Sequence, residues 1–442
     1  PSAEAAPNTI LSKIAQVSWR VNDLTPLSGR QDQGTVLMTH LSPLHDGGAV
    51  GSGSGSDSCA LATKGLAAKA SAGAKQERDL IPLAKDAMLL SRITGADRHD
   101  LREKSLLIVF SCANSKSFTY YLNTQSMPCD VLYVRDPFLN HWYQSGVEAS
   151  SNVDALAASL KRIRESYRSV YCLGSSMGGY ASLLFGSLLG ARRVIALAPQ
   201  VVLDPSFPRS PHRNTPLHYA DIRTMVKQAS DTEILIAFGD LDPVDSYNIS
   251  WLQDGDRFPE HISVVSYLGY DHLFPKALQK AAPLDQYFSQ VFTGFTPETH
   301  GLPFRVGLGL SPAQIEGIQA AVPLYFKKDH AAAFAILKPL IDRYPAWWAA
   351  KQLCGLAGLH GNIEPELSRR FVIEAADKNP RAFEFAHDAA LAEIEAGNAE
   401  GARRYIGRVD AMRKGHAVSL ALLEKYSSAF QSPVVFDKDN VQ

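Results

Sequence analysis

The chain of 442 residues is longer than one hydrophobic core usually supports, so two or more domains are expected. Its apolar content of 45% and aromatic content of 9% are those of a folded globular protein and argue against intrinsic disorder. The 44 basic and 45 acidic side chains nearly cancel and no basic stripe stands out, so nucleic acid is not expected as a partner.

The five cysteines show no spacing typical of a disulfide framework or a thiolate zinc site. They are odd in number, lack a CxxC pair and are scattered, at Cys59, Cys112, Cys129, Cys172 and Cys354. This usage favours a reducing compartment, and we therefore expect a cytoplasmic protein. Apolar runs such as "LLIVF" are far shorter than the about 20 residues of a membrane span, so no transmembrane segment is predicted.

Residues 1–75 are the part of the chain whose structure the sequence defines least. The run "TVLMTHL" (35–41) is typical of a strand, and "GGAVGSGSGSDS" (47–58) has the composition of a flexible linker. We expect an N-terminal segment that contains a Gly/Ser linker and precedes the first domain.

Residues 76–295 alternate between strand-like and helical patterns and are predicted to form one α/β domain. The strand-like runs are "SLLIVFS", "CDVLYVRD", "SVYCLG", "RRVIALAPQ", "EILIAFGDLD" and "HISVVSYLGYDH". Helical stretches such as "VDALAASLKRIRESY" lie between them, and this alternation favours a parallel sheet covered on both faces. A longer Pro- and His-rich insert at 201–230 is a candidate cap over the site that the strand ends create.

Strand-like runs end before residues 296–442, which are predicted to form an all-α domain. The segments "DRYPAWWAAKQLCGLAGLHGN" (342–362) and "DKNPRAFEFAHDAALAEIEAGN" (377–398) align, with Pro345 and Pro380 35 residues apart. Because this is close to the roughly 34-residue period of tetratricopeptide helical pairs, the region resembles a tetratricopeptide-like array of two or three repeats. The alternative is a plain helical bundle. Such arrays bind a partner or pack on their own catalytic domain.

The stretch "VYCLGSSMGGYASLLFG" (170–186) has the pattern of a sharp turn between a strand and a helix. A serine on such a turn is lifted out of the fold in a strained conformation, and the residues two positions on either side must be small. Gly174 and Gly178 flank Ser176 in this way, so Ser176 is the expected nucleophile. Ser175 is less suitable because Leu173 and Met177 flank it, and a simple tight turn is the structural alternative.

A serine nucleophile on such a turn requires an acid and then a histidine later in the chain. The strand-like run that ends at Gly239 is followed by Asp240, Asp242 and Asp245, and the last strand-like run is followed by His272. We expect Asp242 to be the acid, ahead of Asp240 and then Asp245, because its spacing after the strand-end Gly239 is the one that a fold with such a turn uses for its acid. Turn and helix-cap chemistry accounts for the other two aspartates. His272 is the expected base.

The oxyanion formed during acyl transfer requires two backbone N–H donors. Met177, directly after the nucleophile, is expected to supply one. The second should come from the loop after "SLLIVF", where Cys112 is preferred and Ala113 is the alternative. We interpret the Cys112 thiol as a small packed side chain, because no base lies at a known spacing from it.

At "GSSMGG", "GDLD" and "GYDH", in this order, the chain resembles the α/β-hydrolase superfamily over residues 101–292. The resemblance implies an acyl-enzyme mechanism on an ester, thioester or amide, with neither a metal nor an organic cofactor. More loosely, "VFSCANSKSF", "SMGGYASLLFG" and "ALAPQ" are similar to bacterial hydrolase-fold proteins that add or remove O-acyl groups on glycans.

Two further groups of residues have alternative interpretations. Asp136 with His141, Trp142 and Tyr143 forms either an entrance with a stacking surface for a sugar or a loop whose aromatic side chains pack against the sheet. A pair of histidines in the 201–230 insert, His212 and His218, has no carboxylate at ligand spacing, so no metal site is predicted there.

The sequence therefore predicts an acyl hydrolase or acyltransferase with the triad Ser176, Asp242 and His272. The expected substrate is an acylated small molecule or a glycan, preferably an O-acyl ester on a carbohydrate. The alternative is a partner-binding protein in which the helical repeats are the interaction module and the hydrolase domain is an idle scaffold.

Overall fold

The structure, a computed structural model, describes residues 77–84, 86–94, 104–147, 152–281, 283–296, 301–413 and 417–430. All of these residues belong to one compact unit of the chain. The predicted N-terminal segment 1–75, including its strand at 35–41 and its Gly/Ser linker, lies outside the described residues.

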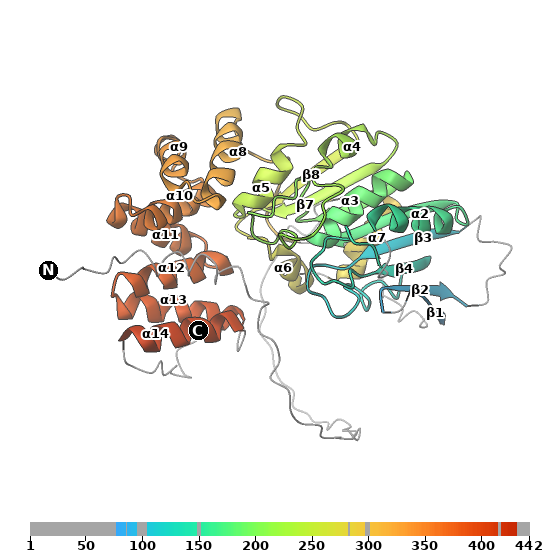
Figure 1. The fold of residues 1–442 in the computed structure, drawn as a ribbon, viewed down its shortest axis with the longest axis horizontal. Helices are drawn as coiled ribbons and strands as arrows, with labels where there is room; N and C mark the ends of the chain where they lie inside the picture. Colours follow the sequence, from blue (N-terminus) through green and yellow to red (C-terminus); the bar gives the residue numbers. More distant parts are fainter. Residues whose placement is uncertain are drawn as a thin grey trace, which may run out of the picture. The chain divides into compact units, whose positions relative to one another are not determined.

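One mixed sheet contains the nine strands of the described residues. The strands are β1 (Arg78–Ala84), β2 (Met88–Ile93), β3 (Ser105–Phe110), β4 (Asp130–Val134), β5 (Ser169–Ser175), β6 (Arg193–Leu197), β7 (Glu233–Gly239), β8 (Ile262–Tyr267) and β9 (Phe304–Val306). Their spatial order is β1-β2-β4-β3-β5-β6-β7-β8-β9, and Figure 1 labels β1, β2, β4 and β3 in this order from one edge of the sheet. The six strands from β4 to β8 in this order are parallel, and β1, β2 and β9 are antiparallel to their neighbours.

The sheet confirms each of the six predicted strand runs and adds strands at both edges. β9 pairs with β8, so the expectation that strands end before residue 296 is wrong. A three-residue edge strand is too short to show the alternation by which strands are recognised in a sequence. β1 and β2 form an antiparallel hairpin that extends the other edge.

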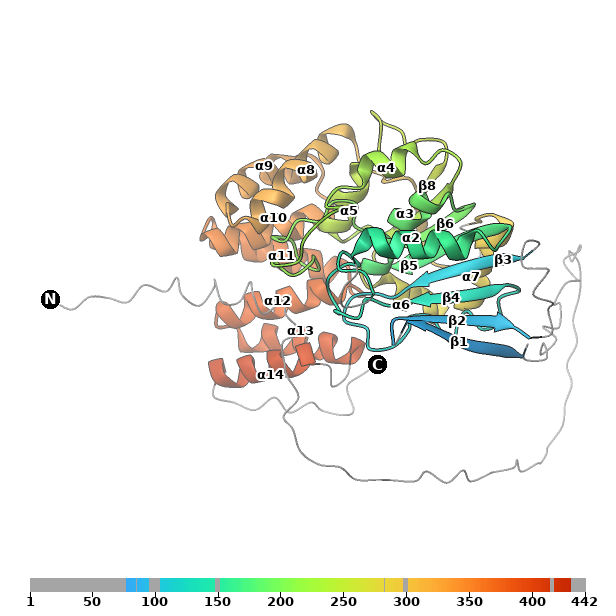
Figure 2. The same ribbon diagram turned by 45° about the vertical axis from the view of Figure 1, so that its right-hand side comes forward.

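Helices cover both faces of the sheet. They are α2 (Val153–Arg164), α3 (Met177–Leu189), α4 (Arg223–Gln228), α5 (Pro243–Ser250), α6 (Phe274–Ala281) and α7 (Leu284–Thr293). In β3, Leu106, Ile108 and Phe110 face the core shared with α2 and α3, whereas Leu107 and Val109 face the core shared with α6 and α7. Figure 2 shows α2 and α3 on one side of the sheet and α7 on the other. Because both faces are buried, the strand is a continuous apolar run, as parallel strands in such sheets are.

Residues after β9 form a series of helices that pack on their neighbours in the chain (Figure 1). They are α8 (Pro312–Phe326), α9 (His330–Arg343), α10 (Trp348–Gly361), α11 (Pro365–Lys378), α12 (Phe383–Glu395), α13 (Ala399–Met412) and α14 (Ala417–Phe430). α12 begins 35 positions after α10, and α13 begins 34 positions after α11. This confirms an α/β sheet domain followed by an all-α region, and its assignment as a tetratricopeptide-like array stays a prediction.

The helical region contacts the loops at the carboxyl ends of the parallel strands. α8 and α10 pack on α5, the helix that follows β7. Leu241, in the loop between β7 and α5, is buried in the core that α11 to α14 form. The insert at 201–230 lies at the same edge, since its Arg209 forms ion pairs with Asp242 after β7 and with Glu384 of α12.

Candidate active site

Ser176 stands on a strained turn between β5 and α3. Its backbone has φ 55° and ψ −119°, an unfavourable conformation for a residue with a side chain, and it keeps partial exposure while both neighbours are buried. A Cβ on Gly174 would lie 2.2 Å from the carbonyl oxygen of Gly178, and a Cβ on Gly178 would lie 2.2 Å from that of Phe110. The two flanking positions are therefore small because strand and helix meet there, as the sequence predicted.

The His272 ring lies between Ser176 and a carboxylate. Ser176 Oγ is 3.1 Å from His272 Nε2, although 96 positions separate the two residues. On the other side of the ring, Nδ1 is 3.0 Å from each carboxylate oxygen of Asp245. An ionised carboxylate only accepts hydrogen bonds, so Nδ1 carries the proton of the neutral ring and Nε2 accepts from the Ser176 hydroxyl. The three groups form a serine–histidine–aspartate hydrogen-bonded chain.

The partner of His272 is Asp245, which corrects the expectation that Asp242 would occupy this position. Asp242 is the N-cap of α5, and its Oδ1 accepts from the N–H groups of Val244 and Asp245, at 2.9 and 2.8 Å. Its other oxygen, Oδ2, is 2.6 Å from Nη2 of Arg209. Capping and the ion pair occupy both oxygens of Asp242, and the His272 ring meets the aspartate one turn further along the helix.

The two aspartates are buried, at 1% exposure for Asp242 and 0% for Asp245, but their pKa values move in opposite directions. Burial would raise the pKa of Asp242, but the positive charge of Arg209 and the facing His272 outweigh burial and lower it. Burial raises the pKa of Asp245, and the negative charge of Asp242 adds to this effect. Arg209 therefore stabilises the ionised form mainly of Asp242.

Two loops bring the acid and the base together, and a glycine allows their contact. A Cβ on Gly239, the last residue of β7, would lie 2.3 Å from the carbonyl oxygen of Tyr270 and 2.4 Å from that of Asp271. The N–H of Leu241 donates to the same Tyr270 carbonyl at 3.0 Å. The loop after β7 and the loop that carries His272 are thus packed directly on each other.

The predicted oxyanion donors lie at the turn around Ser176 between β5 and α3, called the nucleophile elbow below, and after the end of β3. Met177 is the first residue of α3, so its N–H has no intrahelical acceptor and the positive end of the helix dipole adds to it. The N–H of Cys112 donates to Thr119 Oγ1 at 3.2 Å, and the Cys112 thiol lies 3.4 Å from the same oxygen. Because the N–H of Cys112 already donates to Thr119, Ala113 is the better candidate for the second oxyanion donor.

Several residues considered with the site have structural roles. Asp240 accepts from the N–H of Gly269 at 2.7 Å, and burial raises the pKa of Asp240 to about 6. Trp142 and Tyr143 are fully buried, so the sugar-stacking interpretation is wrong for both, and the packing alternative is confirmed for them. Asp136 accepts from backbone N–H groups of its own loop.

Among the described residues, one group has three possible metal-ligand atoms close together. Atoms of Asp242, Asp245 and His272 lie within 4.8 Å of one another. However, each ring nitrogen of His272 is already hydrogen-bonded, to Asp245 and Ser176, and the Arg209 guanidinium neutralises Asp242. This donor set fits proton transfer better than it fits a cation.

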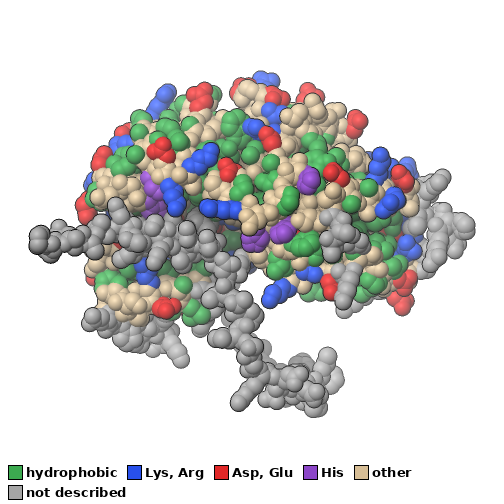
Figure 3. Space-filling model, viewed as in Figure 1, with side chains coloured by type: hydrophobic (Ala, Val, Ile, Leu, Met, Phe, Trp, Pro, Cys, Tyr) green, Lys and Arg blue, Asp and Glu red, His purple; other side chains and the backbone are tan. Residues whose placement is uncertain are grey.

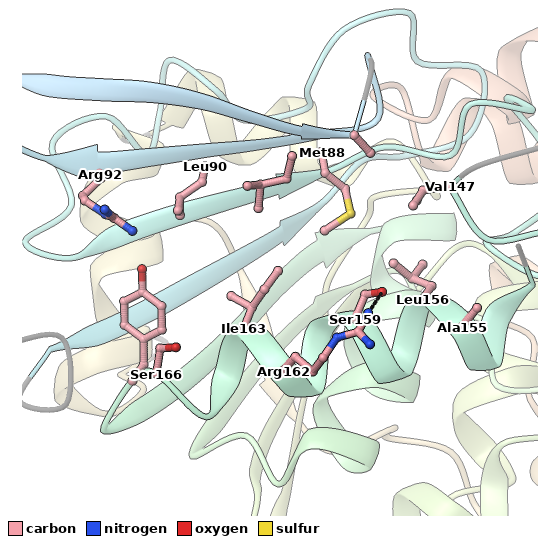
Figure 4. A pocket seen from close by; sticks show the side chains of 13 residues that line it. Met88, Leu90, Arg92, Val147, Ala155, Leu156, Ser159, Arg162, Ile163 and Ser166 are labelled. Atoms are coloured by element: carbon pink, nitrogen blue, oxygen red, sulfur yellow. Dashed lines mark hydrogen bonds between the residues drawn. The ribbon is translucent and has the colours of Figure 1, made fainter. Parts of the chain in front are cut away.

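A pocket of about 500 Å³ between β2 and α2 contains none of the predicted site residues (Figure 4). Apolar side chains such as Leu90 and Leu156 line much of it, together with Arg92 and Arg162. Arg162 donates to Ser159 of the same helix, and no histidine or carboxylate lines the pocket to activate a nucleophile.

Charges of both signs are interspersed on the face of the molecule shown in Figure 3. This distribution agrees with the balanced composition of 44 basic and 45 acidic side chains. Within the part of the chain that the structure describes, no helix combines the length and apolar character needed to cross a membrane.

No protein-family model matches this chain, and no curated protein matches it in sequence. Among solved structures, the chain is similar to a glycosylation-associated protein complex of Streptococcus agalactiae, with 19% identity and a TM-score of 0.35. This match covers 50% of the chain and 47% of that protein, so the chain spans about half the length of this relative. The capsule O-acetyltransferase of Neisseria meningitidis serogroup A matches with 16% identity, a TM-score of 0.33 and coverage of 49% of this chain and 94% of that chain.

A member of the α/β serine hydrolases without a lid, from Xanthomonas campestris, matches with 15% identity, a TM-score of 0.30 and coverage of 50% of this chain and 97% of that chain. At these TM-scores, the similarities define neither an activity nor a substrate for this chain. The chain's own strand order, with a strained serine between β5 and α3 and a histidine after β8, is that of an α/β-hydrolase fold.

Proposed function

We propose that this protein is an acyl-transfer enzyme that works through an acyl-enzyme on Ser176. The observation that carries the proposal is the hydrogen-bonded chain from Ser176 through His272 to Asp245, with distances of 3.1 and 3.0 Å. A serine hydroxyl becomes a useful nucleophile when an adjacent base takes its proton and a third group orients that base. The strained conformation of Ser176 adds support, since such strain is frequent at catalytic positions.

In the proposed mechanism His272 removes the proton from Ser176 as the hydroxyl attacks the acyl carbonyl carbon. Asp245 holds the tautomer with the proton on Nδ1 and stabilises the imidazolium that forms. The N–H groups of Met177 and Ala113 stabilise the oxyanion. His272 then returns the proton to the leaving group, which departs and leaves an ester on Ser176.

The second half of the reaction regenerates the serine. His272 removes a proton from water or from an acceptor hydroxyl, and the resulting nucleophile attacks the ester. Collapse of the second oxyanion breaks the bond to Ser176, which recovers its proton from His272. Hydrolysis and acyl transfer thus share every step except the identity of the acceptor.

The substrate class that we propose is an O-acyl ester, of the acetyl type, on a carbohydrate. This part of the proposal rests on the sequence resemblance of the elbow and the loop after β3 to glycan-modifying hydrolase-fold proteins. Acetate release from an O-acetylated polysaccharide would support hydrolysis, and a mass increase of an added glycan incubated with p-nitrophenyl acetate would support transfer. If neither product forms with any acylated glycan, this substrate class is contradicted.

The activity itself is tested with p-nitrophenyl acetate. We expect turnover by the native chain and a loss of at least about 10³-fold in kcat for Ser176→Ala and for His272→Ala. Ser175→Ala is the matched control, because Ser175 is the adjacent serine but the His272 ring contacts Ser176 and not Ser175, and this variant should retain turnover. Equal rates for Ser176→Ala and the native chain would contradict the proposal.

Absence of turnover in the folded native chain would instead favour the partner-binding alternative. In that case the helical region would be the functional part of the molecule. Its contacts with the loops around the site support a different role, in which it braces its own catalytic domain.

A further inference from the structure

Two aspartates one turn apart lie close enough to orient the same histidine. Carboxylate oxygens of Asp242 and Asp245 and a ring nitrogen of His272 all lie within 4.8 Å of one another. Only Asp245 hydrogen-bonds to the ring, with both of its oxygens 3.0 Å from Nδ1. Something other than proximity therefore decides which carboxylate the ring contacts.

Arg209 holds the competing carboxylate. Its Nη2 is 2.6 Å from Oδ2 of Asp242, whose Oδ1 accepts two backbone N–H groups of α5. Charge-assisted pairs of this kind are the stronger class of hydrogen bond. The guanidinium fixes the orientation of the Asp242 carboxylate, with Oδ2 directed at Arg209 and Oδ1 at the start of α5, so neither oxygen faces Nδ1 of His272.

The helical region anchors Arg209 from its other side. Nη1 of Arg209 is 3.0 Å from Oε1 of Glu384, in the first turn of α12. The backbone N–H of Glu384 faces the carboxylate of Asp271, the residue before His272, at 3.3 Å. The backbone of Arg209 has φ 60°, in the left-handed region, so contacts with its surroundings must hold it there.

We propose that Arg209 is a positioning residue that selects Asp245 over Asp242 as the carboxylate orienting His272, and that Glu384 of the helical region supports this selection. The inference rests on the proposed function. It gives the 201–230 insert and the helical region a defined part in arranging the catalytic base.

The selection has a testable consequence for the loss of Asp245. With Arg209 present, Asp242 is held in its ion pair and cannot replace Asp245. With a neutral residue at 209, Oδ2 of Asp242 loses its charged partner and becomes available to the His272 ring, while Oδ1 still caps α5. The loss of kcat caused by removing Asp245 should therefore depend on which residue stands at position 209. The effects of substitutions at residues that share contacts in this way are expected to be non-additive.

A double-mutant cycle measures this dependence. Turnover of p-nitrophenyl acetate is compared among the native chain, Arg209→Gln, Asp245→Asn and the double variant. Asp245→Asn should lower kcat by about 10⁴-fold in the native background. In the Arg209→Gln background the same substitution should lower kcat by about 10³-fold at most. Adding Asp242→Asn to the double variant should remove the recovered activity. The same loss for Asp245→Asn in both backgrounds would overturn the proposal.

The contribution of the helical region is tested in the same assay. In a Glu384→Gln background the cost of Asp245→Asn should fall, but less than in the Arg209→Gln background. An unchanged cost would overturn the part assigned to Glu384.

A second comparison leaves Arg209 intact, in case its replacement unfolds the chain. Asp245→Asn and the Asp242→Asn/Asp245→Asn pair should have the same residual activity, because Asp242 does not act while Arg209 holds it. A further loss in the pair would mean that Asp242 already substitutes, which overturns the proposal. If the native chain shows no Ser176-dependent turnover, the proposed function fails; if it does and the losses are additive, only this inference fails.

Discussion

Replacing Gly178 with alanine should damage the nucleophile elbow without touching any reacting atom. The new Cβ would lie 2.2 Å from the carbonyl oxygen of Phe110, whereas ordinary contact begins at 3.4 Å. Phe110 ends a central strand and is fully buried, so the strand cannot retreat. The start of α3, with Ser176 and Met177 beside it, must therefore move.

The expected size of the effect follows from that displacement. Overpacking of this kind destabilises a protein by about 1–3 kcal/mol. A shift of about 1 Å in a reacting group costs about 10²-fold in rate. We therefore expect Gly178→Ala to lower kcat on p-nitrophenyl acetate about 10²-fold while the protein remains folded, as measured by steady-state kinetics and denaturant titration.

Gly407→Ala is the matched control for this prediction. Gly407 lies inside α13, where an added Cβ would meet nothing within 4 Å. Alanine in a helix interior is favoured over glycine by about 0.5–1 kcal/mol, so this variant should be slightly more stable and fully active. A Gly178→Ala protein with native stability and native kcat would refute the steric account of the elbow.

Two further predictions concern groups outside the proposed triad. Asp240 has a folded pKa of about 6, above the unfolded value, so its contribution to stability is present at low pH and lost as the pH rises through 6. Asp240→Asn, which keeps an acceptor for Gly269, should therefore raise the free energy of unfolding by about 1–2 kcal/mol at pH 8 and by almost nothing at pH 4, in denaturant titrations; an equal gain at both pH values would contradict this reasoning. Cys112→Ala should retain turnover of p-nitrophenyl acetate, since the thiol contacts Thr119 and is not the proposed nucleophile; loss of turnover in a folded variant would contradict that assignment.

The central strands and the elbow could be predicted because their residues carry strong local signals. Buried parallel strands are continuous apolar runs, and the elbow requires glycines at two fixed positions around Ser176. The hairpin of β1 and β2 was missed. β1, "RDLIPLA", contains charges and a proline and is mostly exposed, so it lacks the apolar run that marks a central strand.

The expected acid, Asp242, is not the aspartate that contacts His272, although the sequence contains a signal that distinguishes the two. Asp242 stands directly before Pro243, and an Asp followed by Pro is typical of an N-cap and the first position of a helix. This pattern indicates that the Asp242 side chain caps α5. Asp245, one turn later, was then the aspartate free to meet the base.

The ion pairs of Arg209 could not be predicted from local patterns. Arg209 and Glu384 are 175 positions apart and come from an irregular insert and from a helix of the all-α region. Neither periodicity nor motif spacing relates them, since their contact depends on how the helical region packs on the sheet domain. Tertiary packing alone brings the second ion pair to the site.

The most direct test of the proposed triad is the covalent modification of Ser176. A fluorophosphonate probe reacts with an activated serine, and the adduct can be assigned to one residue by mass spectrometry of peptides. We expect stoichiometric labelling of Ser176 in the native chain, none in Ser176→Ala and much slower labelling in His272→Ala. An adduct on a different residue, or no adduct in a folded native chain, would contradict the account.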